Sequence, residues 1–246
     1  PYVRQKLKFF VAKVNLKEQA KTGSDYLRPL QFSFDYERFG LPIRLGMINA
    51  RGPQDLVLYV LTRNGRVETT NYRTVKLPAN MDIPTYVRGE FPAFYKALFD
   101  NQASREGHRV VFTEYFWDMS WCDPCAADPL NREELQAAGA SWVSGTAQAQ
   151  PVMVTRLHVR YTRETFPEDL MFQETKDRAN WQTRYVLRHP WRGDPAACPE
   201  VKAYVEAVAA REEREAQVLA NLTGANVEAV RRRMRPPLAI GPAAER

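Results

Sequence analysis

Cys122 and Cys125 are the residues of this sequence whose types and spacing most directly suggest chemistry. They lie in "SWCDPCAADP" (residues 120–129), and Trp-Cys-x-Pro-Cys is the pattern of a thioredoxin-type redox site. The C-x-x-C spacing lets two thiols approach within bonding distance. Thiol–disulfide exchange also needs an attacking thiol with a lowered pKa, which the N-terminus of a following helix usually supplies. The dithiol hypothesis therefore makes Cys122 the attacking thiol and Cys125 the resolving thiol.

The residues after the cysteines argue against such a helix. In "AADP" (residues 126–129), Pro129 disfavours helix at the residue before it and has no N–H to donate. The next helix is predicted to begin afresh at Asn131, and no partner loop with a cis-proline is recognised downstream. A structural disulfide between Cys122 and Cys125 in an oxidising compartment is therefore favoured. A thiol–disulfide oxidoreductase that uses the same pair stays the alternative.

A zinc site is a weaker alternative for the same cysteines. Cys122, Cys125, His189 and Cys198 would together supply four ligands. A strong zinc signature has two close pairs, whereas His189 and Cys198 stand far apart in the sequence. Without zinc, Cys198 would be free or paired with a cysteine outside this chain. The sequence predicts no metal and no cofactor.

Other catalytic signatures are not recognised. The sequence has no P-loop, dinucleotide-binding, zincin or serine-hydrolase motif. His108, His158 and His189 are scattered, which indicates surface or hydrogen-bonded side chains. Glu168 and Asp169 are adjacent in a predicted turn, whereas a glycosidase needs two carboxylates facing each other across a cleft. The sequence favours a non-enzymatic role, and a hydrolase without a recognisable motif stays open.

Composition excludes several classes of protein. The chain has 246 residues, of which 44% are apolar and 26% charged, as in ordinary globular proteins. It contains no apolar run long enough to span a membrane. The net charge is +6, but the densest basic run, Arg231–Arg233 with Arg235, is typical of a solvated helix end. Because no nucleic-acid-binding motif accompanies the charge, we expect no nucleic-acid partner.

The elements that would position these residues form an α+β fold with a largely antiparallel sheet and segregated helices. Asn64-Gly65 predicts a hairpin between residues 55–63 and 66–77. Residues 41–50 belong to the same region of strands and turns. Helices are predicted over residues 86–107, 131–139 and 226–234, and a long C-terminal helix over residues 200–222. Further strands are predicted over residues 8–16, 30–37, 109–117, 151–162 and 181–191.

Local signals specify some of these elements in detail. Asn131 and Glu134 match a capping box. Residues 151–162 alternate, with Met153, Thr155, Leu157, Val159 and Tyr161 on one face. The long helix has an apolar stripe, and Arg211 to Glu215 is interpreted as a solvated charge cluster. The predicted organisation is an α+β body (residues 1–195), a C-terminal helical segment packing on or extending from it (196–235), and a tail (236–246).

Several long stretches together resemble one known family. They are "KFFVAKVNL", "YLRPLQF", "LPIRLGMINARGPQDLVLYVLTRNGRVETTNYRTVKLP", "FTEYFWDMSWCDPCAADPL", "TRLHVRYTRETFPEDLMFQET" and "RYVLRHPW". In this order they are similar to the bacterial DUF2330 domain family, from about Lys6 to Trp191. The resemblance implies an exported protein of unknown function, with an N-terminal signal and a further N-terminal portion. It supplies no catalytic residues, and export strengthens the disulfide interpretation, because an adjacent cysteine pair outside the cytosol is expected to be oxidised.

The expected function follows from these observations. The chain starts at Pro1 without an initiator methionine, so we expect it to correspond to the C-terminal part of a family member. We expect a non-catalytic periplasmic or extracellular domain that binds a protein partner, as a scaffold or accessory subunit of an envelope-associated assembly. No transmembrane segment is predicted in this chain, although association with a membrane complex is compatible with the expected role.

Overall fold

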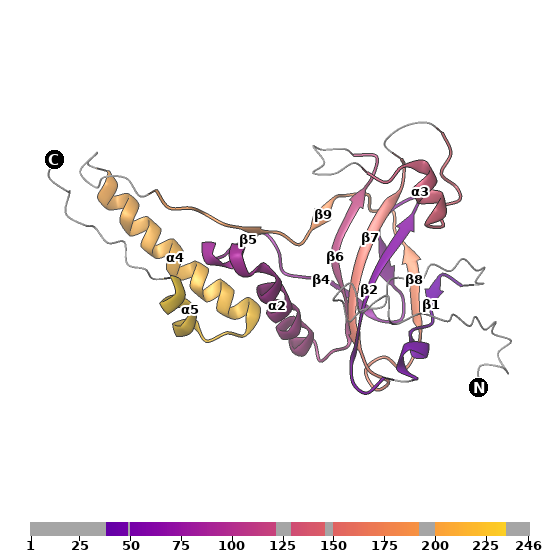
Figure 1. Cartoon of the computed structure of the whole chain (residues 1–246), viewed down its shortest axis with the longest axis horizontal. Helices are drawn as coiled ribbons and strands as arrows, with labels where there is room; N and C mark the ends of the chain where they lie inside the picture. The colour runs from indigo at the N-terminus through magenta and orange to yellow at the C-terminus, as the bar shows by residue number, and fades with distance from the viewer. Residues whose placement is uncertain (1–37, 49, 122–128, 146–149, 192–199, 235–246) are drawn as a thin grey trace, which may run out of the picture. The chain divides into compact units, whose positions relative to one another are not determined.

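The computed structural model of the chain is organised around a five-stranded mixed sheet (Figure 1). The structure describes residues 38–48, 50–121, 129–145, 150–191 and 200–234. In the sheet, β2 (Gln54–Thr62) pairs with β7 (Met153–Tyr161), and β7 pairs with β6 (Val110–Asp118). The parallel strand β4 (Arg73–Lys76) lies beside the first half of β6, and β9 (Trp181–Gln182) lies beside the second half.

A second, smaller sheet encloses the main core with the large one. Its order is β1 (Gly40–Leu41), β8 (Leu170–Glu174) and β3 (Val67–Thr69), all antiparallel. The 3-10 helix η3 (Ile43–Met47) contributes two buried side chains to this core. The predicted alternation of β7 is confirmed, because Leu157 and Val159 are fully buried on one face of the strand. The core consists of Ile43, Met47, Val111, Leu157, Val159, Tyr161, Phe166 and Leu170.

A separate core joins the helices. The 3-10 helix η4 (Thr85–Glu90) leads into α2 (Phe91–Arg105), which packs against the long helix α4 (Val201–Thr223). The short helix α5 (Val227–Met234) packs back on α4, and β5 (Met81–Asp82) pairs in parallel with β10 (Tyr185–Val186). The buried residues of this core are Ile83, Val87, Phe94, Leu98, Ala216, Leu219, Leu222 and Val230.

The ends of the helices follow the local sequence signals. In α3 (Arg132–Ala137), Asn131 accepts from the backbone N–H of Glu134, and the Glu134 carboxylate accepts from the backbone N–H of Asn131. The predicted capping box is therefore confirmed. The helix α4 ends at Gly224, whose φ of 72° is in the left-handed region that favours glycine. The side chain of Asn101 in α2 donates to the last carbonyls of α4, which ties the two helices together.

The predicted hairpin at Asn64-Gly65 is wrong. After β2 the chain crosses to the other sheet, where β3 pairs with β8. Long-range contacts override the local turn preference: the Asn64 side chain donates to Glu174, and Arg66 N–H donates to the carbonyl of Asp177. Gly65 permits this crossing, since a Cβ there would lie 2.5 Å from the carbonyl oxygen of Thr175.

Three other predicted segments are divided differently in the structure. Within residues 41–50, which were expected to form strands and turns, the structure has the end of β1 followed by η3. Residues 66–77 form β3 and β4, which belong to different sheets. Residues 181–191 form β9 and β10, each with its own partner strand. In each of the three segments, the sequence indicated part of the extended or turn structure correctly. Which strands pair with each other was decided by residues far away in the sequence.

The interpretation of Arg211 to Glu215 as a solvated cluster is wrong at its last member. Glu215 is only 3% exposed, although it is charged and lies on the long helix α4. Its carboxylate pairs with Arg211 one turn earlier, at 3.2 Å. Burial raises the pKa of Glu215, the charges of Asp82 and Glu212 act in the same direction, and Arg211 opposes them.

This burial gives a pH-dependent prediction. A carboxyl whose pKa is raised in the folded protein stabilises the fold at low pH, and this stabilisation is lost as the pH rises through the folded pKa. The free energy of unfolding of Glu215→Gln relative to the parent should therefore increase as the pH rises above the unfolded pKa of a glutamate, about 4.3. Urea unfolding at several pH values measures this difference. Glu206→Gln, at an exposed position of the same helix, is the control and should show no such trend.

The predicted fold class is confirmed. The described residues form an α+β structure with a long C-terminal helix, and their sheet pairings are antiparallel except for β4 with β6 and β5 with β10. The predicted strands over residues 8–16 and 30–37, and the predicted tail over residues 236–246, lie outside the described residues. No described helix has the length and apolar character needed to cross a membrane.

Candidate functional site

The cysteine-based sites that the sequence suggests fall mostly outside the described residues. Cys122, Cys125 and Cys198 belong to segments that the structure does not describe, and His189 is exposed. Within the described ranges, no group of three or more histidine, cysteine, aspartate or glutamate side chains could hold a metal ion. The disulfide, the dithiol alternative and the zinc alternative therefore stay predictions.

The structure brings another set of titratable residues together around Glu114. The register of β6 against β7 shifts between Thr113, opposite Leu157, and Tyr115, opposite Arg156. Glu114 is the extra residue of this bulge, and a bulge re-aims the residues that follow it. Because Phe112 is opposite His158, Glu114 lies two residues further along on the same face, and its carboxylate is only 3% exposed. The bulge adds Tyr115 to this face, opposite Arg156.

Three polar side chains contact the carboxylate of Glu114, and a fourth residue binds its backbone carbonyl. The hydroxyl of Tyr95 in α2 donates to Oε1 at 2.6 Å, and His158 Nδ1 lies 2.8 Å from the same oxygen. The guanidinium of Arg156 pairs with Oε2. The backbone N–H and hydroxyl of Thr183 both donate to the Glu114 carbonyl, at 2.9 and 2.8 Å. A buried carboxylate with this many partners is stable as an anion.

The pKa values follow from these contacts. Burial alone would raise the pKa of Glu114, but hydrogen bonds from His158 and Tyr95 and the charges of His158 and Arg156 more than offset it, so the pKa lies below its usual value. The pKa of Tyr95 is raised by burial first and then by its hydrogen bond to Glu114. Tyr95 therefore stays a neutral donor and Glu114 an ionised acceptor over the physiological range.

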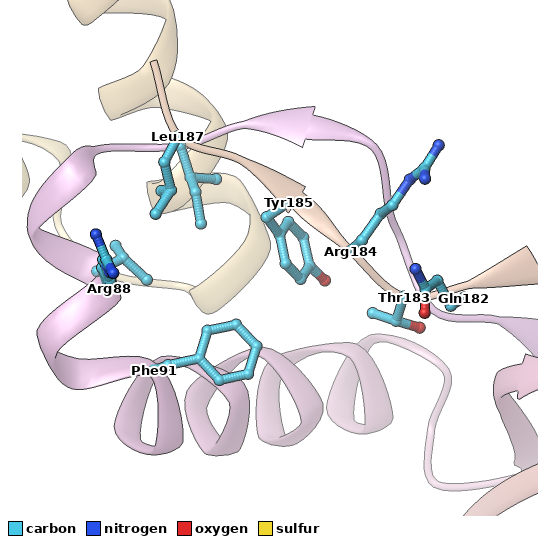
Figure 2. A pocket seen from close by; sticks show the side chains of 9 residues that line it. Arg88, Phe91, Gln182, Thr183, Arg184, Tyr185 and Leu187 are labelled. Atoms are coloured by element: carbon cyan, nitrogen blue, oxygen red, sulfur yellow. The ribbon is translucent and has the colours of Figure 1, made fainter. Parts of the chain in front are cut away.

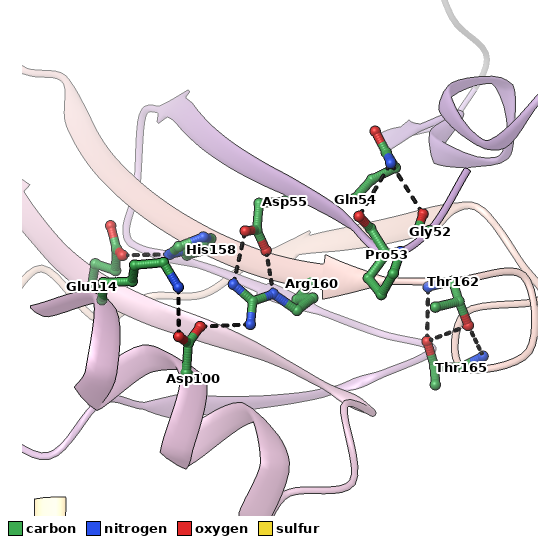
Figure 3. A network of polar contacts seen from close by, with 11 residues as sticks. Gly52, Pro53, Gln54, Asp55, Asp100, Glu114, His158, Arg160, Thr162 and Thr165 are labelled. Atoms are coloured by element: carbon green, nitrogen blue, oxygen red, sulfur yellow. Dashed lines mark hydrogen bonds and ion pairs between the residues drawn. The ribbon is translucent and has the colours of Figure 1, made fainter. Parts of the chain in front are cut away.

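The helix α2 closes over this cluster (Figure 3). The ring of Phe99 stacks on His158, with 3.7 Å between centroids and 5° between planes. Next to it, the guanidinium of Arg160 donates to Asp55 in β2 and to Asp100 in α2. These contacts fix α2 to the sheet through polar and aromatic contacts rather than through apolar packing alone.

Part of the same sheet face is not covered by α2 and is exposed. Cross-strand pairing places Tyr59 opposite Arg156, and Arg156 opposite Tyr115. We call Val57, Tyr59, Tyr115, Trp117 and Arg156 the aromatic face. Tyr59 is 59% exposed, its ring centroid lies 6.4 Å from that of Tyr115, and the guanidinium of Arg156 lies 5.3 Å from it. Arg156 thus connects the aromatic face to the buried Glu114.

A tight turn leads from the aromatic face toward the cysteine segment. The carboxylate of Asp118 accepts from the backbone N–H and hydroxyl of Ser120 and from the guanidinium of Arg178. The indole N–H of Trp117 donates to the carbonyl of Trp121, whose own side chain is 65% exposed. The last described residue before the cysteines therefore has a fixed backbone and an exposed indole.

The other charged residues considered in the sequence have structural partners. Asp169 pairs with Arg44, and Glu168 accepts from the Asn71 side chain, so these adjacent carboxylates hold loops together. In the basic run, Arg231 pairs with Glu213 and Glu228, and Arg233 pairs with Glu90. Arg232 and Arg233 are exposed, so these surface pairs are compatible with the solvated helix end that the sequence suggested.

Sequence reasoning missed Glu114 and the aromatic face. A glutamate inside the apolar strand "VVFTEYFW" was a usable signal, because an ionised side chain in a buried strand needs partners. The prediction for His158, a hydrogen-bonded side chain, is confirmed by its contact with Glu114. The bulge that places Tyr115 on the same face as Glu114 left no sequence signal that was recognised.

Comparison with known proteins places the chain in a family. No curated protein and no solved structure matches it. The family match includes the cysteine pair, Glu114 and the aromatic face, and it ends before β9, α4 and α5, short of the Trp191 to which the resemblance was expected to extend. The chain belongs to the family described as an uncharacterized protein conserved in bacteria (DUF2330), which matches residues 1–173.

Proposed function

We propose that this chain is a non-catalytic exported domain that binds a protein partner through the aromatic face. The observation that carries the proposal is the exposure of Tyr59 beside Tyr115 and Arg156 on a paired strand of the large sheet. Tyrosine, tryptophan and arginine are the residue types that contribute most binding energy in protein interfaces. A partner of the accessory or scaffold type, in an envelope-associated assembly, fits such a surface.

The cluster beside the aromatic face supports binding rather than catalysis. Glu114, His158 and Tyr95 bond to one another, and α2 covers them, so their polar groups are engaged within the fold. The pair of Glu114 with Arg156 holds the guanidinium beside Tyr59. A side chain that is fixed before binding loses less conformational entropy when a partner arrives.

The exported location rests on different support. The family resemblance implies export, and the cysteine pair suits an oxidising compartment. A periplasmic or extracellular location would also leave the aromatic face accessible to an envelope-associated partner. Fractionation of the native bacterium, with detection of the full-length protein, tests this part of the proposal: recovery in the cytosol would contradict it.

Truncating Tyr59 should weaken the partner complex. In purification of the full-length protein from its native host, we expect Tyr59→Ala to lower affinity for the co-purifying partner by about 10–100-fold, since a central aromatic residue contributes about 2 kcal/mol or more. Ile48→Ala is the matched control, because Ile48 is 55% exposed and lies outside the aromatic face. Retention of the partner by Tyr59→Ala, or purification of the native protein as a lone monomer, would contradict the proposal.

The cysteine pair gives a second test, which separates binding from redox catalysis. If Cys122 and Cys125 form a structural disulfide, replacing both by serine should lower the melting temperature, and these two cysteines of the parent protein should resist thiol alkylation until they are reduced. The partner complex should survive the replacement. A readily alkylated Cys122 with a low pKa, and a redox potential in the range of thiol oxidoreductases, would favour the alternative function.

A further inference from the structure

A pocket of about 270 Å³ lies between the first turn of α2 and the chain that carries β10 (Figure 2). It shares no residue with the aromatic face, so what it binds is independent of the proposed function. Its walls come from η4 and α2 on one side and from residues 182–187 on the other. Because pockets for drug-sized ligands are usually about 300–1,000 Å³, this one suits a group about the size of one large side chain.

The interior of the pocket is apolar. The ring of Phe91, 44% exposed, faces Tyr185 and Leu187 across the opening, as Figure 2 shows. Buried Ile83 and Val87 complete the lining. The hydroxyl of Tyr185 already donates to the carbonyl of Pro78. An aromatic or branched aliphatic group would therefore meet apolar surface and would displace no internal hydrogen bond of Tyr185.

The polar groups at the pocket are basic or neutral. The side chains of Arg88 and Gln182 line it and make no hydrogen bond or ion pair with any other described residue. Arg184 donates to the side chain of Asn80, a neutral partner, and its guanidinium points away from Phe91 (Figure 2). The nearby carboxylate of Glu90 is already paired with Arg233. The positive charge of Arg88 at the rim of the pocket is therefore not paired with a carboxylate in the described part of the chain.

Taken together, the geometry points to a binding site for a small apolar carboxylate, with its apolar group between Phe91 and Leu187 and its carboxylate at Arg88. An unpaired guanidinium beside an apolar pocket selects an acid over its neutral analogue, because charge-assisted hydrogen bonds are about twice as strong as neutral ones. Two sources offer this chemistry: a free carboxylic acid, and the C-terminal residue of a peptide.

A titration followed by NMR of the isotope-labelled full chain tests the site. The probes are 3-phenylpropionate, its neutral analogue 3-phenylpropan-1-ol, and a short peptide that ends in phenylalanine with a free or an amidated C-terminus. We expect saturable shifts for residues around Phe91 and Leu187, with the acid bound roughly tenfold more tightly than the alcohol. If the free-ended peptide binds more tightly than 3-phenylpropionate, the natural ligand is a chain terminus; if not, it is a free acid.

Substitutions test whether Arg88 causes the preference for the acid over the alcohol. Arg88→Gln should abolish the preference for acid over alcohol, while Phe91→Ala should weaken both probes. Arg51→Gln is the matched control, since it removes one positive charge from an exposed position that does not line the pocket. Equal affinity for acid and alcohol, the absence of saturable shifts, or an equal loss in Arg51→Gln and Arg88→Gln would each overturn the assignment. These outcomes do not depend on any partner at the aromatic face.

Discussion

Replacing Glu114 by glutamine is expected to lower the free energy of unfolding by about 3–5 kcal/mol, the usual cost of removing one partner of a buried ion pair. The amide of the new side chain would carry no charge to pair with the guanidinium of Arg156, with which the carboxylate now forms an ion pair. It would also leave His158 without its anionic partner. Chemical denaturation of the purified chain measures the loss.

The pH dependence of this loss has a definite sign. The pKa of Glu114 is lowered in the folded protein, so its stabilising contribution is present above the unfolded pKa and is lost as the pH falls through the folded pKa. The difference between the parent and Glu114→Gln should therefore shrink on acidification. Tyr95→Phe removes only one donor and should cost about 1 kcal/mol. Equal losses for the two variants would contradict a central role for the carboxylate.

Truncating Phe166 to alanine should have a comparable effect on stability for a different reason. Phe166 is among the fully buried side chains of the core between the two sheets, where its ring lies 4.4 Å from Tyr72 and 6.4 Å from Tyr161 between centroids. Removing such a ring leaves a cavity, which typically costs about 3–5 kcal/mol. The loss should be independent of pH below about pH 8. Burial raises the pKa of the neighbouring Tyr72 and Tyr161, so both stay neutral in that range.

An exposed phenylalanine supplies the control for this experiment. Phe39 contacts Phe172 at the edge of the small sheet but remains largely exposed. We expect Phe39→Ala to cost less than about 1 kcal/mol, as surface substitutions usually do. If Phe166→Ala costs as little as Phe39→Ala in the same denaturation assay, the two sheets do not share the core that the structure shows.

Signals that act over a few residues predicted the structure well. The capping box at Asn131 and Glu134 needs only residues within one turn, and so does the left-handed end of α4 at Gly224. The alternation of β7 was equally informative, because one of its faces is buried throughout. For such elements the sequence contains both the structure and its physical reason.

Choices between distant partners could not be predicted in the same way. Asn64-Gly65 is compatible with a hairpin, but Glu174 and Asp177, more than a hundred residues later, bind this turn and direct the chain to the other sheet. Glu215 has the sequence environment of a solvated helix, and its burial depends on packing that periodicity does not report. The site was missed for the same reason, because the pairing of β6 with β7 brings Glu114 to His158, and a bulge in β6 adds Tyr115 to the same face.

Buried polar residues and exposed aromatic residues have different roles in the proposed function. The ion pair with Glu114 holds Arg156 in place, and Arg156 lies against the exposed ring of Tyr59. Asp118 fixes the turn that presents Trp121 at the edge of the cysteine segment. Buried polar contacts thus support exposed aromatic groups, an arrangement that suits recognition of a partner by a preformed surface.

Photocrosslinking in the native host tests the aromatic face most directly. A photoreactive phenylalanine analogue would replace Tyr59 in the full-length protein, and the same analogue at Ile48 would serve as the control position. We predict one dominant crosslinked partner protein from position 59 and none from position 48. Crosslinking from position 48 alone, or from neither position, would contradict partner binding at the aromatic face.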